Sequence, residues 1–148
     1  MPMVRAMIRP YTDADLDDVL DVWYEASVIA HAFLPADFFP DERVQLAERW
    51  LPQAETYVAE VDGRVVGFLS IVGDEIGGLF VHPDHQGAGV GRALVDHVRS
   101  SRATLELDVF EENEIGRRFY AAYGFEHVRT HRDEQTGHVL HRLRLVPG

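Results

Sequence analysis

Val81-His-Pro-Asp-His-Gln86-Gly-Ala-Gly-Val-Gly-Arg92 is the stretch that decides the fold of this 148-residue chain. A predicted strand ends at Pro83, and a helix begins among glycines at alternate positions. The first N–H groups of a helix have no partner within it and carry the positive end of its dipole. Because glycine has no Cβ, this backbone can approach a phosphate closely, and Arg92 adds positive charge. The segment predicts a phosphate-binding turn.

The spacing of these glycines excludes two common phosphate-binding loops. A dinucleotide-binding fingerprint needs glycines at positions 1, 3 and 6, but the sixth place counted from Gly87 is Arg92. A Walker loop needs a lysine, and all 14 basic residues here are arginine. The pattern that remains is Gln-x-x-Gly-x-Gly, formed by Gln86, Gly89 and Gly91.

Composition narrows the class of protein further. The length fits a single domain over residues 1–148. The absence of cysteine excludes disulfides, thiolate-bound metal and a cysteine acyl-enzyme. The net charge of −11 argues against nucleic-acid binding and mildly favours a cationic acceptor such as an amine. No apolar run is long enough to span a bilayer, and Met1–Ile8 does not resemble a secretory signal, so we expect a cytoplasmic protein without a membrane partner, as a monomer or homodimer.

Hydrophobic periodicity and turn residues predict an α/β (α+β) domain with a mixed sheet. Asp62-Gly63 is a strong signal for a two-residue hairpin. Thr12 is a predicted N-cap for a first helix that includes Leu16 to Ala26. The other expected helices are Asp41–Leu51, Gly87–Ser101 and Asn113–Tyr123. The expected strands are Val4–Arg9, Thr56–Val61, Arg64–Val72, Glu75–His82, Leu105–Phe110, Glu126–Arg132 and His138–Val146.

With Val81-His-Pro83 before it, the glycine pattern resembles the signature of the GCN5-related N-acetyltransferase (GNAT) family, and the element order is similar over nearly the whole chain. The resemblance implies a mostly antiparallel sheet of about seven strands, splayed between the fourth and fifth strands and flanked by about four helices. It also implies acetyl-CoA as acyl donor. The residues expected to bind its pyrophosphate are Gln86, Gly87, Ala88, Gly89, Val90, Gly91 and Arg92.

A second motif, Asn113-x-x-Gly116-x-x-Phe119-Tyr120-x-x-x-Gly124-Phe125, resembles the family's closing segment. Gly116 departs from the usual alanine, which we expect to loosen the helix slightly. The resemblance gives Asn113 a contact with the cofactor arm and makes Tyr120 the general acid for the CoA thiolate. A phenol, with a pKa of about 10, is protonated at neutral pH and suits that role. Ile115, Phe119 and Tyr123 lie on one helical stripe, which predicts core positions.

The acetyl carbonyl and the acceptor amine need further groups. The resemblance assigns oxyanion donation to backbone amides at Phe80 and Val81. Gly77-Gly78 just before them is consistent with a bulge, with a close backbone approach or with a weak edge strand, and the sequence does not separate these. Glu75 lies eleven residues before Gln86, the spacing of the catalytic glutamate in the histone-acetylating branch. It is therefore a candidate general base. An exposed turn glutamate, with a water chain as the base, is equally open.

His31 and Phe33 are candidate acceptor-binding residues. Together with Trp23, Ser27 and Leu34 they resemble a small bacterial, YjaB-like branch of the family. A histidine beside an apolar loop is, however, often only packed. The pairs His82-x-x-His85 and His138-x-x-His141 lack a matched carboxylate shell, so we expect no metal.

The sequence therefore predicts an N-acetyltransferase that moves acetyl directly from acetyl-CoA to a primary amine of a small molecule or peptide. We expect the acceptor to enter beside the loop in Ser27–Pro40 and the strand that carries Glu106 and Asp108. A non-catalytic acyl-CoA-binding or sensing module, and a transferase for a different acyl-CoA, are the alternatives.

Overall fold

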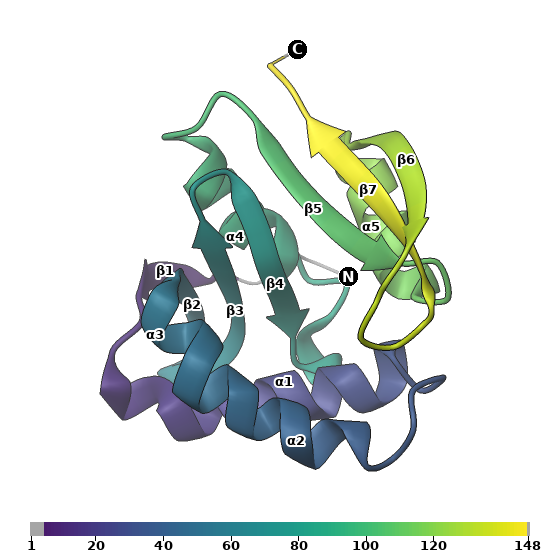
Figure 1. Cartoon of the computed structure of the whole chain (residues 1–148). Coiled ribbons are helices and arrows are strands. Elements are labelled where there is room, and N and C mark those ends of the chain that lie inside the picture. Colours follow the sequence, from purple (N-terminus) through teal and green to yellow (C-terminus); the bar gives the residue numbers. More distant parts are fainter. Residues whose placement is uncertain (1–4, 148) are drawn as a thin grey trace.

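Seven strands form one sheet in the order β1-β2-β3-β4-β5-β7-β6 in the computed structural model, which describes residues 5–147 (Figure 1). The strands are β1 (Met7–Pro10), β2 (Glu55–Val61), β3 (Arg64–Val72), β4 (Glu75–Val81), β5 (Leu105–Phe110), β6 (Glu126–Arg132) and β7 (Val139–Leu145). Every neighbouring pair is antiparallel except β4 and β5, which run parallel. The mixed, mostly antiparallel sheet expected from the resemblance is confirmed.

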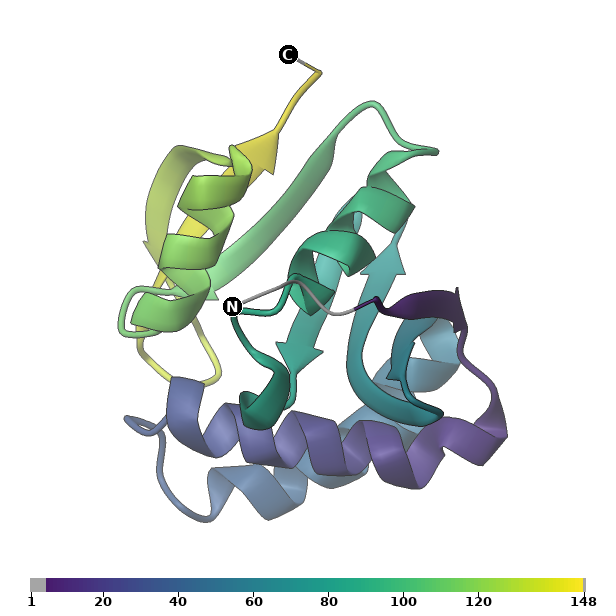
Figure 2. The same ribbon diagram turned by 180° about the vertical axis from the view of Figure 1, so that it is seen from behind.

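Helices cover both faces of this sheet. They are α1 (Leu16–Ala30), α2 (Phe38–Gln45), α3 (Leu51–Gln53), α4 (Val90–Arg99) and α5 (Glu114–Tyr123). On one face, Val19 and Trp23 of α1 join Phe39 of α2 in a buried cluster with Val58 and Phe68 of the sheet. On the other face, α4 and α5 contribute to a second buried cluster, and both lie in front of the strands in Figure 2. The two layers leave the end of β4 accessible between α4 and α5.

Several element boundaries differ from expectation. The helix expected from Asp41 begins at Phe38 instead, because Pro40 falls in its first turn, where a missing N–H costs nothing. It continues through a wider π-helical turn, Leu46–Trp50, into α3. Thr12 precedes a short 3₁₀ turn rather than α1 itself. The first strand begins at Met7, and the expected start at Val4 lies outside the described residues.

Two glycine-containing expectations are confirmed. Asp62 and Gly63 both have positive φ, 52° and 78°, and join β2 to β3 as a tight hairpin. Gly77 is the extra residue where the pairing of β3 with β4 shifts register, which is a bulge.

The sheet is splayed between its fourth and fifth strands. β4 and β5 are paired only at Glu75 and Glu106, and the Glu106 amide donates to the Asp74 carbonyl at 2.9 Å. Figure 1 shows the two strands separating from that end toward α1. The backbone edge of β4 is therefore open near Val81, directly before the glycine-rich turn.

Candidate functional site

A cavity of about 640 Å³ lies between α4 and α5, beside the end of β4. Its walls include Val81, Gly89, Gly91, Arg92, Phe119 and Tyr120. The glycine-rich turn and the second motif, about thirty residues apart in the sequence, thus meet at one cavity. Its size is within the range of small-molecule and cofactor sites.

The N-terminus of α4 opens into this cavity. Gly87 and Gly89 have φ of 77° and 89°, a left-handed backbone that favours glycine. The helix begins at Val90, later than expected, and no side chain caps it. The N–H groups of its first turn are consequently free to bind an anion.

Gly91 lets the two helices approach each other closely. A Cβ at this position would lie 3.2 Å from Cε1 of Phe119 and 3.7 Å from Cγ2 of Val81. An alanine here would therefore press on the ring of Phe119, which would have to shift by a few tenths of an ångström.

Positive charge flanks the mouth of the cavity. The guanidinium carbons of Arg92 and Arg99 lie 5.3 and 5.7 Å from the centre of the Tyr123 ring. The Tyr123 hydroxyl donates to Oδ1 of Asp96 at 2.5 Å and ties α5 to α4. Arg92 lines the cavity, where it can add to the anion affinity of the helix terminus.

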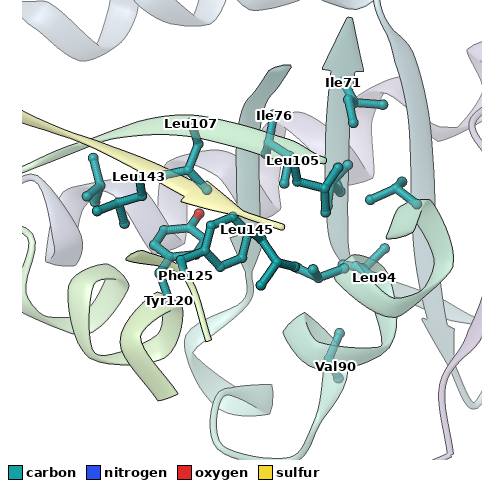
Figure 3. Close-up of a cluster of buried hydrophobic side chains, with 14 of the residues drawn as sticks. Ile71, Ile76, Val90, Leu94, Leu105, Leu107, Tyr120, Phe125, Leu143 and Leu145 are labelled. Carbon is teal, nitrogen blue, oxygen red and sulfur yellow. The ribbon is translucent and has the colours of Figure 1, made fainter. Parts of the chain in front are cut away.

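Tyr120 is the buried residue of α5. Its ring packs 5.3 Å from that of Phe125 and is 8% exposed, and Figure 3 shows it between α5 and the sheet beside Phe125. Burial raises the pKa of the phenol above its usual value. The group is therefore protonated at neutral pH and lies where it can donate a proton inside the cavity.

Val81 and Phe80 face opposite directions. The His82 amide donates to the Val66 carbonyl of β3 at 2.8 Å, so alternation points the Phe80 amide toward β3 and the Val81 amide toward the open edge. The Val81 carbonyl accepts from Nε2 of Gln86 at 3.0 Å. Gln86 therefore holds the turn against the strand end, and Val81 is the better placed of the two expected amide donors.

Asn113 caps α5. Its Oδ1 accepts from the Gly116 amide at 2.9 Å, and its Nδ2 lies 3.5 Å from Nε2 of His31. Ala88 is buried at 6% exposure. Both residues were predicted to bind the cofactor, but neither Asn113 nor Ala88 lines the cavity.

Glu75 lies at the closed end of the splay. Both of its carboxylate oxygens accept from Arg142, at 2.7 and 2.5 Å. Glu106 and Asp108 also lie within 3.6 and 3.4 Å of Arg142. The structure thus places Glu75 in an ion-pair group at the other end of β4 from the cavity.

His31 and Phe33 belong to a group of five rings on the opposite side of the splay from α4. We call it the ring cluster: His31, Phe33, Phe80, Phe110 and His138. The centre of the His31 ring is 6.4 Å from that of Phe80 on β4 and 5.2 Å from that of Phe110 on β5. His31 therefore bridges the two strands where they separate. Burial lowers its pKa to about 4, so the imidazole is neutral.

The sequence missed part of the cavity wall. Ile115 was predicted to be a core residue, but its side chain is 44% exposed. It lines the cavity together with Phe119 and Tyr123. A stripe at helical spacing cannot distinguish the two cases, because cofactor cavities are also lined by apolar side chains. His85 lines the cavity too, and within the described residues its buried Nδ1 has no hydrogen-bond partner.

Two further observations concern residues 5–147 only. They contain no group of three or more histidine and acidic side chains arranged to hold a metal ion. None of their helices is both long and apolar enough to cross a bilayer.

Comparisons with known proteins agree with this geometry. Residues 52–127 match a family model described as an acetyltransferase (GNAT) domain. The peptidyl-lysine N-acetyltransferase YiaC of Escherichia coli is 32% identical over 82% of this chain and 84% of its own. The peptidyl-lysine N-acetyltransferase YjaB of the same organism is 34% identical, with 80% and 81% covered.

Solved structures share this fold. The solution structure of apo YjaB from E. coli superposes with a TM-score of 0.86 at 29% identity and covers 98% of this chain and all of that one (100%). The PaiA N-acetyltransferase of Thermoplasma acidophilum, solved in complex with coenzyme A, has a TM-score of 0.76 at 16% identity, with 97% and 100% covered. At that identity, the second likeness concerns the fold alone.

Proposed function

The chain belongs to the GNAT family of acyl-CoA-dependent acetyltransferases, and on that premise we propose that it transfers acetyl from acetyl-CoA directly to a primary amine, with a peptide lysine as the first candidate. The observation that carries the proposal is the meeting of an uncapped helix N-terminus with a buried, protonated phenol in one cavity. The first feature suits a pyrophosphate and the second suits a leaving thiolate.

The residues present fit acetyl-CoA as donor. In this proposal the amides of Val90, Gly91 and Arg92 bind the pyrophosphate, and the open edge of β4 receives the pantetheine arm. The Val81 amide donates to the acetyl carbonyl, where negative charge develops during attack. Tyr120 gives its proton to the sulfur as the C–S bond breaks.

Two observations support an amine acceptor. YiaC and YjaB are named as peptidyl-lysine N-acetyltransferases. The net charge of −11 favours the approach of a cation.

The proposal is tested by measuring CoA release with a panel of amines. The panel comprises a peptide with one lysine and blocked termini, a peptide with a free N-terminus, a polyamine and an aminoglycoside. Calorimetry with acetyl-CoA and propionyl-CoA runs in parallel. We expect binding of acetyl-CoA and acetylation of the blocked lysine peptide, verified by mass. Tight binding without acetylation of any amine would instead identify a binding or sensing module, and a preference for propionyl-CoA would change the donor.

A further inference from the structure

The acceptor amine must lose a proton before it attacks, and the ring cluster offers a group for this step. An alkylammonium has no free electron pair, so the reaction needs a base near the splay. Both oxygens of Glu75 are bound to Arg142. His31 is half-buried, and its Nε2 faces the Nδ2 donor of Asn113 at 3.5 Å. His138 differs from both, because a carboxylate orients its ring and the ring packs on Phe33, the candidate acceptor-binding residue.

The His138 ring is fixed by Glu112. Its Nδ1 lies 2.7 Å from Oε1 of Glu112, in the turn between β5 and α5. A carboxylate at Nδ1 places the proton on that nitrogen and leaves Nε2 as the acceptor. The ring is thereby oriented so that Nε2 can take a proton. The side chain of His138 is 29% exposed, so solvent can remove that proton after each turnover.

The neighbours of His138 connect it to the splay. Its ring centre lies 4.9 Å from that of Phe33 and 6.4 Å from that of Phe110. Phe110 ends β5, where that strand has separated from β4. The other titratable groups on this side are His31, whose ring also packs against Phe33 and Phe110, and Glu111, which is paired with His141. Glu112 is therefore the anion that faces His138 directly.

We propose that His138, oriented by Glu112, is the proton acceptor for the acceptor ammonium, directly or through one water. This inference rests on the proposed function. The ammonium N–H bond breaks and the proton moves to Nε2 of His138. The nitrogen electron pair then forms the C–N bond at the thioester carbonyl. As the C–S bond breaks, Tyr120 protonates the sulfur, and the second nitrogen proton restores the phenol. His138 releases its proton to solvent, so one proton is produced per acetyl transferred.

The chain contains a matched control for this pair. His138 directly precedes β7 and His141 lies on it, where its Nε2 is 3.1 Å from Oε1 of Glu111, the residue next to Glu112. Its ring, however, packs on that of His127 of β6, with centres 5.2 Å apart, and does not join the ring cluster. His141→Gln and Glu111→Gln therefore remove the same kind of pair from the same region without changing the proposed base.

The test compares kcat/KM as a function of pH for wild type, His138→Gln, Glu112→Gln, Glu75→Gln and the two controls, with the best amine of the panel. We expect His138→Gln to lose about 100-fold or more at neutral pH, and to lose the ionisation that limits the wild-type rate on the acid side. Glu112→Gln should lose less, about tenfold, because the ring remains but is no longer oriented. The controls should stay within about twofold, since only surface pairs change. Added imidazole should partly restore His138→Ala.

Each outcome decides between the proposals. If His138→Gln retains the wild-type rate and pH profile while wild type acetylates amines, the proposed base is wrong and the proposed function stands. If Glu75→Gln rather than His138→Gln removes the acid-side ionisation, Glu75 is the base. If wild type releases no CoA with any amine, both proposals fall. Acetyl-CoA affinity, measured by calorimetry, should be equal in all variants, so that a loss of rate reports proton transfer rather than donor binding.

Discussion

The side chain of Asn113 occupies the space beside Gly116 where any larger residue would have its Cβ. A Cβ on Gly116 would lie 2.6 Å from Nδ2 of Asn113, too close for the side chain to stay where it is. From this position Asn113 caps α5 through Oδ1 and reaches His31 through Nδ2. Glycine at position 116, where the family usually has alanine, therefore makes room for the Asn113 cap and does not merely loosen the helix.

This coupling predicts a non-additive pair of substitutions. Gly116→Ala gains about 1 kcal/mol of helix propensity but loses the cap, also about 1 kcal/mol, so the free energy of unfolding should barely change. In an Asn113→Ala background the cap is already lost. Gly116→Ala should then raise the free energy of unfolding by the whole gain in helix propensity, about 1 kcal/mol. Urea denaturation of the four proteins measures both values. Equal effects of Gly116→Ala in the two backgrounds would contradict the coupling.

Tyr120→Phe should separate catalysis from stability. Desolvation is the cause that raises the pKa of this phenol, and no hydrogen bond to another described residue contributes. Removing the hydroxyl should therefore change stability by only about 0.5 kcal/mol or less. Turnover should fall by about 100-fold or more if the phenol is the acid, with the acetyl-CoA Kd within about twofold of wild type. Undiminished turnover would remove Tyr120 from the mechanism.

The glycine turn can be tested against a glycine of the same conformation elsewhere. Gly87 at the cavity and Gly63 in the β2–β3 hairpin have φ of 77° and 78°, and a Cβ on either would meet no atom within 4 Å. Alanine at either position should cost about 1–2 kcal/mol of stability through backbone strain alone. Only Gly87→Ala should also weaken CoA binding, by about tenfold, because its backbone approaches the phosphate. Calorimetry against both variants checks this, and equal CoA affinities would place the phosphate elsewhere.

Stability should fall with acidification because of His31. Burial lowers its folded-state pKa from 6.5 to about 4, so the unfolded chain binds a proton more readily. The contribution is fully present above pH 6.5 and is lost as pH falls through about 4, by about 3 kcal/mol in total. Denaturant unfolding of wild type and His31→Gln at several pH values should give curves that converge over this window.

The exposed His127 is a suitable control for that experiment, since His127→Gln should keep the wild-type pH dependence. Asp15, whose pKa is lowered to about 2 by the hydrogen bonds of Arg9, loses its own contribution only below its usual value of 3.8. Its effect therefore lies outside the His31 window. A His31→Gln protein with unchanged pH dependence would show that the imidazole is not desolvated.

The sequence by itself determined the order of the strands and helices and the position of the anion-binding turn. These depend on local chemistry: glycines at Gly87 and Gly89 for a left-handed backbone, a proline that ends β4, and Asp62-Gly63 for a hairpin. Asn113 as a helix start and Gly124 as a helix stop were readable for the same reason.

Only the tertiary structure decided which side chains meet. Phe119 and Tyr123 pack against the core as predicted, but they also line the cavity together with the exposed Ile115, because α5 faces α4 across the splay. Glu75 contacts Arg142, which is 67 positions away in the sequence. His138 contacts Phe33, which is more than one hundred positions away. Periodicity reports which face of an element is apolar, but the partner of that face depends on how the strands diverge, and no local pattern contains that information.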